Sequence, residues 1–485
     1  MKPYFPHVAI FSVGLLISGC MVGPKYVKPT VPMAAAFKEQ APESFKESDG
    51  WKPAQPGDQQ IRGKWWEVFH DPELNALEEE ATVSNQELKV AEARFRQARA
   101  TIRFNRSAEF PTISTAPSIV NERDSAHQPY FPPSLANNGT GSFTLPVDLS
   151  YEVDLWGRIR RTVNASREEA QASAGDLQTV NLSLHAELAV DYFELRSADA
   201  QKRLLDDTVK SYTDALTLTQ NRFEGGAAPR SDVAQAKTQL DGAQVADTDI
   251  TVARAQFEHA IAILIGKPPA EFNLAPVPQT ALQLPVIPVG LPTTLLERRP
   301  DIAAGERRVA EANDQIGIAR AAFFPSLVLG ATGGFTGTSI TNWLTWPSRM
   351  WAVGPQLSQT IFDAGRRRAV SESAYANYDG TVASYRQTAL TAFQEVEDNL
   401  AALRILEQEA QQQREATASA ADSLQLFTNR YTGGVDNYLQ VITAQTVLLA
   451  NQRNDIDLMR RRMDASVLLV KAVGGGWDTT QLPKL

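Results

Sequence analysis

The chain has 485 residues, of which 43% are hydrophobic and 21% are charged, and its formal net charge at pH 7 is −9. The pI near 5.3 and the lack of any run rich in Lys and Arg argue against nucleic acid as a partner. The mean hydropathy of −0.27 is low for a membrane protein and indicates long segments that are solvated on more than one face.

The first twenty residues are typical of a targeting segment, with Lys2, a short apolar run and then Ile17-Ser18-Gly19-Cys20. This pattern resembles a bacterial lipobox, so we expect a signal peptide over residues 1–19 and a lipid on Cys20. A plain signal peptide with an incidental cysteine is the alternative. Because Cys20 is the only cysteine, an intramolecular disulfide is excluded. No later stretch approaches 18 apolar residues, so we expect any membrane span to be a β-barrel.

Residues 20–63 contain repeated prolines and predict an extended leader that lies along the surface. Asp71 followed by Pro72 predicts a helix start, with a capping carboxylate and proline at the first helical position. We expect this helix to continue to about residue 108. Three aromatic residues just before it are interpreted as core packing: Trp65, Trp66 and Phe69.

Apolar and polar residues alternate between Ser142 and Leu155, which predicts a strand with one apolar and one polar face. Strands of this kind are predicted at about 111–122, 141–155, 325–337 and 349–362. Each is long enough for a tilted transmembrane strand of roughly 9–11 residues, although a soluble, half-buried sheet gives the same pattern. Because transmembrane barrels have at least about 8 strands, several chains would have to contribute, and a trimer would supply about 12.

Two long helical hairpins are predicted after these strand pairs. The first runs from Gly157 to Phe223 and returns from Ser231, a predicted cap, to Gly266; the second lies between Gly365 and Gly474, where proline is absent. The tip turns are placed at about 224–231 and 432–439. Glycine pairs supply the freedom to reverse the chain, namely Gly225 with Gly226 and Gly433 with Gly434.

The second hairpin repeats the first at an offset of about 208 residues, so that Gly157 matches Gly365 and Gly266 matches Gly474. We interpret the chain as a tandem duplication of a unit that contains two strands and one coiled-coil hairpin. The predicted organisation is a first repeat at 64–266, a linker at 267–298, a second repeat at 299–476 and a tail at 477–485.

No phosphate loop, dinucleotide fingerprint, nucleophile elbow or His-Glu-x-x-His motif occurs. The histidines lack the spacing of metal ligands, and Gly474-Gly475-Gly476 follows a helix, which favours a helix end over a phosphate site. We therefore expect a protein that is not an enzyme and has neither a cofactor nor a metal.

Taken together, these features resemble the TolC-like outer-membrane factors of tripartite efflux pumps, and within them the OprM and NodT-type lipoproteins. The resemblance covers essentially the whole mature chain. Its motifs are Trp65-Trp66 with Phe69 and Asp71-Pro72, Arg298-Arg299-Pro300-Asp301-Ile302, Phe324-Pro325, Ile361-Phe362-Asp363 with Gly365-Arg366, Gly434-Val435-Asp436-Asn437-Tyr438-Leu439, and Gly474-Gly475-Gly476-Trp477.

The resemblance implies a homotrimer in the outer membrane, with a 12-stranded β-barrel above a periplasmic α-helical barrel and an equatorial collar. The partners it implies are a periplasmic adaptor (a membrane fusion protein), an inner-membrane RND transporter and outer-membrane lipid. The same architecture serves type I secretion of peptides or proteins, which is the nearest alternative function. A periplasmic coiled-coil adaptor or structural protein is an alternative of a different class, but it leaves the strand patterns unexplained.

By the same resemblance, the hairpin tips form a closed gate that faces the adaptor. The candidate gate residues are Asp436, Tyr438, Arg430, Tyr431 and Arg222. Asp436 has two interpretations: it caps the returning helix, or it holds the closed state through a positive partner. Relatives often carry an aspartate ring on the returning helix of the second repeat. This chain has Gln440 and Thr443 there, so that ring is not expected.

Overall fold

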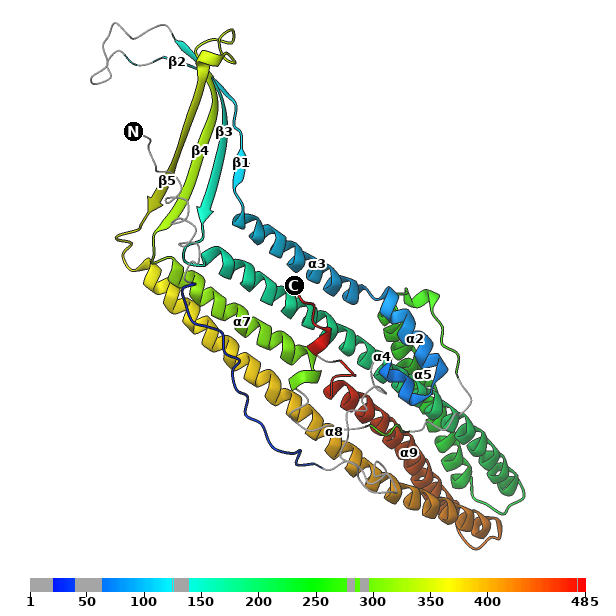
Figure 1. Ribbon diagram of the computed structural model, residues 1–485. Coiled ribbons are helices and arrows are strands. Elements are labelled where there is room, and N and C mark those ends of the chain that lie inside the picture. The colour runs from blue at the N-terminus through cyan, green and yellow to red at the C-terminus, as the bar shows by residue number, and fades with distance from the viewer. Residues whose placement is uncertain are drawn as a thin grey trace.

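The computed structural model describes residues 21–39, 63–123, 125, 139–276, 284–287, 296–477 and 479–485. The predicted signal peptide and Cys20 lie outside these ranges, as do much of the leader and of the linker. The molecule is elongated, with a sheet at one end and two helical hairpins at the other (Figure 1). The described start of the chain runs along the helices between them.

The sheet is antiparallel throughout, in the order β1–β3–β4–β5. Its strands are β1 (Thr112–Ser114), β2 (Ser118–Glu122), β3 (Thr140–Val153), β4 (Ser326–Gly337) and β5 (Arg349–Ser358). β2 pairs with the same edge of β3 as β1 does. The predicted strand at 111–122 is therefore interrupted, at residues 115–117, where Pro117 has no N–H to donate. The strand predicted to reach 362 ends at Ser358.

The strand register matches residues of the same character across the sheet. On one face Leu149 lies opposite Ala331, which in turn lies opposite Val353. On the other face the Thr332 hydroxyl donates to the Asp148 carboxylate at 2.6 Å. One surface of the sheet is thus apolar and the other polar.

The helices repeat in length and position. α4 (Arg158–Glu224) and α8 (Arg366–Thr432) both have 67 residues, and α5 (Arg230–Leu264) and α9 (Tyr438–Ala472) both have 35. Other α-helices in the described residues are α2 (Pro72–Ser84), α3 (Gln86–Arg106) and α7 (Pro300–Ala321). Short 3-10 turns are η3 (Trp65–Phe69), η4 (Ser107–Glu109), η6 (Pro269–Glu271), η7 (Trp346–Ser348) and η8 (Thr479–Gln481).

The prediction of one helix from Pro72 to about residue 108 is wrong, because Asn85 divides it. Asn85 leaves helical geometry with ψ 132°, and its side chain accepts a hydrogen bond from the Leu88 N–H as the N-cap of α3. The cap predicted at Asp71 is confirmed: its carboxylate accepts from the N–H groups of Glu73 and Leu74 at 3.0 and 3.2 Å.

Helices near the sheet pack in the order α3–α4–α7–α8, which is the order of the strands above them (Figure 1). Farther away, α5 packs on α4, and α9 lies between α4 and α8. No helix in the described ranges has both the length and the apolar character needed to cross a membrane.

The main core lies at the middle of the molecule, where α2, α4, α5, α8 and α9 meet. The aromatic cluster predicted to pack there does so: Trp65, Trp66 and Phe69 are 3%, 5% and 6% exposed. Leu188 and Leu195 of α4 are fully buried in the same core. The three glycines from Gly474 to Gly476 all have positive φ and end α9, as expected for a helix end.

The described leader, residues 21–39, is bound along α7 and α8. Arg161 donates from Nε to the Val22 carbonyl at 2.7 Å, and Arg386 donates to the Thr30 carbonyl at 3.1 Å. At its far end, the N–H groups of Lys38 and Glu39 donate to the Glu397 carboxylate. This part of the leader therefore crosses α4, α7 and α8 on the surface of the molecule, where it was predicted to lie.

Candidate functional site

The two hairpin tips are built by the same turn. α4 and α8 each end in a glycine pair whose second member has positive φ, 72° at Gly226 and 75° at Gly434. Gly225 and Gly433 keep negative φ values of −78° and −73°. The next N–H groups bond back to the helix: Ala227 N–H to Arg222 O at 2.8 Å and Val435 N–H to Arg430 O at 2.9 Å. Only the second glycine of each pair is therefore required by backbone conformation.

Arg222 joins the first hairpin to the second. Its guanidinium donates to the Thr432 carbonyl at 3.0 Å and lies 4.7 Å from the centroid of the Tyr431 ring. Tyr431 and Tyr438 are 3% and 2% exposed, and their ring centroids are 5.1 Å apart. Tyr438 is thus a packing residue between the hairpins within one chain, together with Ala236 and Val441. Its burial raises its pKa to about 12.

Asp436 pairs with Arg430 of its own hairpin. Arg430 donates from Nε and Nη2 to the two carboxylate oxygens at 2.6 and 3.2 Å. Hydrogen bonding from Arg430 lowers the pKa of Asp436, so this carboxylate is ionised over the physiological range. The pair lies at the surface, with the Arg430 side chain 55% exposed.

Both predicted caps of the returning helices are wrong. α9 begins at Tyr438 with Asn437 as its N-cap, and no side chain accepts a bond there. The Asp436 carboxylate instead receives the two charge-assisted bonds from Arg430. α5 begins at Arg230 with Pro229 as its N-cap, which places Ser231 inside the helix.

Three further tip residues were not singled out by the sequence. Thr219 is completely buried, and its hydroxyl donates to the Ala215 carbonyl at 2.8 Å. Asp232 is 8% exposed, and burial raises the pKa of its carboxyl group. Gln239 donates to the Thr446 hydroxyl at 2.9 Å and forms a second link between the hairpins. Helical periodicity marks these positions as inward-facing but does not identify their partners.

The tip also carries exposed apolar side chains. Val435 is 65% exposed, Leu439 is 51% exposed and Phe223 is 44% exposed. Ala228 occupies the position in the first hairpin that matches Asp436 in the second, so only one hairpin of each chain presents the Asp436–Arg430 pair. The site is therefore an end at which two hairpins contact each other through side chains, with apolar and charged groups on its surface.

Comparison with known proteins gives matches over almost the whole chain. The family model described as outer membrane efflux protein matches residues 77–267 and 291–475. The probable efflux pump outer membrane protein SepC of Pseudomonas putida is 33% identical over 483 residues, which cover 99% of this chain and 98% of SepC. The outer membrane protein OprJ of Pseudomonas aeruginosa is 31% identical, over 98% of this chain and 97% of OprJ. The structure of the outer-membrane channel OprN superposes with a TM-score of 0.84 at 28% identity, covering 94% of this chain and all of OprN.

Proposed function

The chain belongs to the outer membrane efflux protein family, and we propose that it is the exit duct of a tripartite multidrug efflux pump whose inner-membrane component is an RND transporter. The observation that carries the proposal is the match of sheet and hairpins together, over nearly the full length of efflux-pump relatives. Channels of this family are not enzymes; they conduct substrates passively from the pump to the exterior.

We propose that the working channel is a homotrimer. Within the described residues, the sheet has two unpaired edges, β1 with β2 on one side and β5 on the other. Unpaired edges are open to further strand pairing. If β5 of one copy pairs with the β1–β2 edge of the next, three chains close a 12-stranded β-barrel. The helices continue it as a periplasmic α-helical barrel, because strands and helices follow the same order.

We also propose that the two halves of the chain arose by tandem duplication, with repeats at 64–266 and 299–476. The equal lengths of α4 and α8 and of α5 and α9 support it, as does the constant offset of their first residues, Arg158 with Arg366 and Arg230 with Tyr438. Residues 20–63 would then be a lipidated leader, 267–298 part of the equatorial region, and 477–485 the tail.

The hairpin tips are the proposed contact with the periplasmic adaptor and the proposed gate. Their exposed apolar residues suit a protein partner, and the Asp436–Arg430 pair adds a charged group to every second hairpin of a trimer. The alternative of type I secretion uses the same duct. A periplasmic coiled-coil adaptor is disfavoured, because the chain carries a two-faced sheet in addition to its hairpins.

A reconstitution experiment tests the function. The chain is expressed with candidate adaptor and RND pairs in a host that lacks its own outer-membrane channel, and efflux of a fluorescent dye is measured. We expect dye efflux that depends on all three components, and heat-modifiable trimers in the outer-membrane fraction. Release of a peptide substrate with secretion partners, and no dye efflux with any RND pair, would favour the secretion alternative.

The lipid anchor has its own test. We expect Cys20→Ala to abolish incorporation of radioactive palmitate while leaving trimers in the outer membrane, because a few acyl chains anchor less strongly than inserted strands. Equal labelling of the parent and the Cys20→Ala protein would contradict lipidation at this residue.

A further inference from the structure

The junction between sheet and helices is unusually rich in arginine. Four to seven residues separate each long strand or strand pair from its adjoining helix, so four helix ends lie at one level. The last turn of α3 holds Arg103 and Arg106, and the last turn of α7 holds Arg320. The first turns of α4 and α8 add six more: Arg158, Arg160, Arg161, Arg366, Arg367 and Arg368.

These six arginines are not explained by helix stability. The N-terminus of a helix carries partial positive charge, so cations in the first turn are unfavourable, and among the described residues only one carboxylate at each helix start, Asp154 or Asp363, accepts hydrogen bonds from first-turn N–H groups. Both α4 and α8 nevertheless have three arginines in the first turn. A requirement for positive charge at this level accounts for both.

Five of the nine arginines are neutralised within the chain. Their carboxylate partners lie 2.6–3.5 Å away: Arg106–Glu109, Arg158–Glu152, Arg160–Asp154, Arg161–Asp314 and Arg367–Asp363. In the described part of the chain, no carboxylate lies within 4 Å of the other four, which are Arg103, Arg320, Arg366 and Arg368. All four are exposed, and the junction therefore has an excess of positive charge.

Large exposed apolar side chains lie near these arginines in the sequence. Ile361 and Phe362, which precede the first residue of α8 by five and four positions, are 92% and 85% exposed. Phe104 and Phe110, at the end of α3, are 76% and 61% exposed. A band that combines exposed aromatic rings with arginine is typical of a membrane–water boundary, where rings lie among acyl chains and cations among phosphates.

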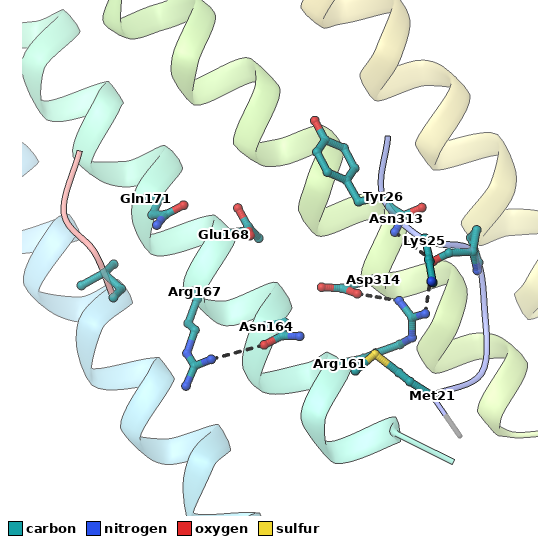
Figure 2. A pocket seen from close by; sticks show the side chains of 12 residues that line it. Met21, Lys25, Tyr26, Arg161, Asn164, Arg167, Glu168, Gln171, Asn313 and Asp314 are labelled. Atoms are coloured by element: carbon teal, nitrogen blue, oxygen red, sulfur yellow. Dashed lines mark hydrogen bonds and ion pairs between the residues drawn. The ribbon is translucent and has the colours of Figure 1, made fainter. Parts of the chain in front are cut away.

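The described start of the leader lies at the same level. The Val22 N–H donates to the Trp156 carbonyl at 3.1 Å, immediately before α4. Met21 lies beside Arg161, which also donates to Asp314 and to the Pro24 carbonyl (Figure 2). The described part of the leader therefore starts at the junction, with the residue that follows Cys20 in the sequence.

We propose that Arg103, Arg320, Arg366 and Arg368 form a phosphate-binding belt for anionic phospholipid headgroups of the membrane leaflet that faces the periplasm. The proposal rests on the proposed outer-membrane location. The belt fixes the depth of the channel in the bilayer, together with the exposed aromatic residues. Attraction of this kind is electrostatic and is weakened by salt.

The test uses full-length trimers in phosphatidylcholine vesicles that contain a trace of spin-labelled phosphatidylglycerol or phosphatidylcholine. The parent is expected to favour phosphatidylglycerol, by up to roughly fivefold for each arginine that reaches the headgroups at low salt. This preference should approach unity in 1 M salt, where the screening length is about 3 Å.

Three variants make the assignment specific. R366Q/R368Q should lose much of the preference and R103Q/R320Q/R366Q/R368Q nearly all of it, while R366K/R368K should retain it. The matched control K237Q/R453Q removes two exposed cations from α5 and α9, far from the junction, and should behave as the parent.

Two results would overturn the belt. One is that the unsubstituted protein inserts and conducts in planar bilayers but shows no preference for phosphatidylglycerol. This result would contradict the belt and leave the proposed channel function unaffected. The other is an R366Q/R368Q variant that behaves the same in both lipids but is altered in another way. Dissociation of its trimers would mean that the arginines form a subunit contact, and altered ion selectivity would mean that they line the lumen. A parent that fails to insert at all would instead contradict the proposed function.

Discussion

The Asp436–Arg430 pair offers a direct test of gating. Asp436→Asn removes the charge with almost no change in shape, and it leaves the turn intact because Asp436 is not the helix cap. If the pair helps to hold a closed end, conductance of the isolated channel in a planar bilayer should rise.

Arg430→Gln is the matched change and should have a similar effect, since either variant breaks the same pair. Unchanged conductance in folded, trimeric Asp436→Asn would remove Asp436 from the gate. Tyr438 would not take its place, because it is buried between the hairpins.

Asp464 on α9 makes stability depend on pH. Burial and the neighbouring Glu194 raise its pKa to about 7, although Arg460 lies 2.9 Å away. One of its oxygens, Oδ1, is buried without a hydrogen-bond partner. A carboxyl group with a raised pKa in the folded state favours folding when protonated, so its contribution is lost as pH rises from about 4 to 7.

The free energy of unfolding should fall by roughly 2–4 kcal/mol less between pH 4 and pH 8 in Asp464→Asn than in the unsubstituted protein, because one pKa unit corresponds to about 1.4 kcal/mol. Thermal unfolding of trimers across that range measures it. If the parent and Asp464→Asn lose stability in parallel as pH rises, another group is responsible.

Sequence patterns predicted the burial of residues better than they predicted the tertiary contacts between them. Trp65, Trp66 and Phe69 were identified as core from their composition alone, and they are buried. His185 showed no ligand spacing, yet its Nδ1 lies 2.6 Å from the buried Glu78 carboxylate, 107 residues away in the chain. Arg222 and Thr432 are 210 residues apart. Such contacts depend on how helices are placed in space, which periodicity does not specify.

The hairpin turns can be tested with neighbouring glycines. Gly434 has φ 75°, so Gly434→Ala should destabilise the turn by about 1–2 kcal/mol although its Cβ would meet no atom within 4 Å. Gly433 has φ −73°, and Gly433→Ala should change stability by less than about 0.5 kcal/mol. Hydrogen exchange of the backbone amides at the tip measures the change in turn stability in both variants. Equal protection in the two variants would mean that positive φ does not limit the turn.

The two faces of β3 can be compared in the same way. Val147→Arg or Leu149→Arg should cost about 2–4 kcal/mol if the apolar face meets the middle of the bilayer, whereas Ser150→Arg on the polar face should be tolerated. The fraction of protein recovered as heat-modifiable trimer measures the difference. Equal recovery of all three variants would contradict a transmembrane position for this strand.

Strands and helices were predictable to within a few residues where one period continued over many residues. The alternation from Ser142 to Leu155 corresponds to β3, and the long helical pattern after Gly157 corresponds to α4. Errors arose at breaks that depend on local hydrogen bonds. Asn85 divides a continuous helical pattern by capping α3, and residues 115–117 interrupt β1 and β2.

For the molecule as an assembly, the sequence predicted four two-faced strands per chain, and the trimer is the assembly that the family resemblance implies. The structure adds that strands and helices share one lateral order. Neither the register between neighbouring copies nor the position of the leader on α7 and α8 is encoded in hydrophobic periodicity. Both depend on contacts between surfaces that look equally polar in the sequence.

The way in which the leader is bound has a consequence for how the sequence can diverge. Helix side chains recognise it largely through peptide groups, which every residue type provides: the carbonyls of Val22, Pro24 and Thr30 and the N–H groups of Lys38 and Glu39. Most leader positions should therefore accept substitution, while Arg161, Arg386 and Glu397 should not.

Gly23 is an exception within the leader, since its φ is 113° and a Cβ there would lie 2.7 Å from the Gly317 Cα. The other exceptions are Tyr26, which donates to Glu306, Val31 and Phe37, which pack on core clusters, and Glu39, whose carboxylate accepts from Arg404 at 2.6 Å. Saturation mutagenesis of residues 21–39 should thus show sensitivity at Gly23, Tyr26, Val31, Phe37 and Glu39 in an otherwise permissive segment, while the helix residues that bind its peptide groups should be intolerant.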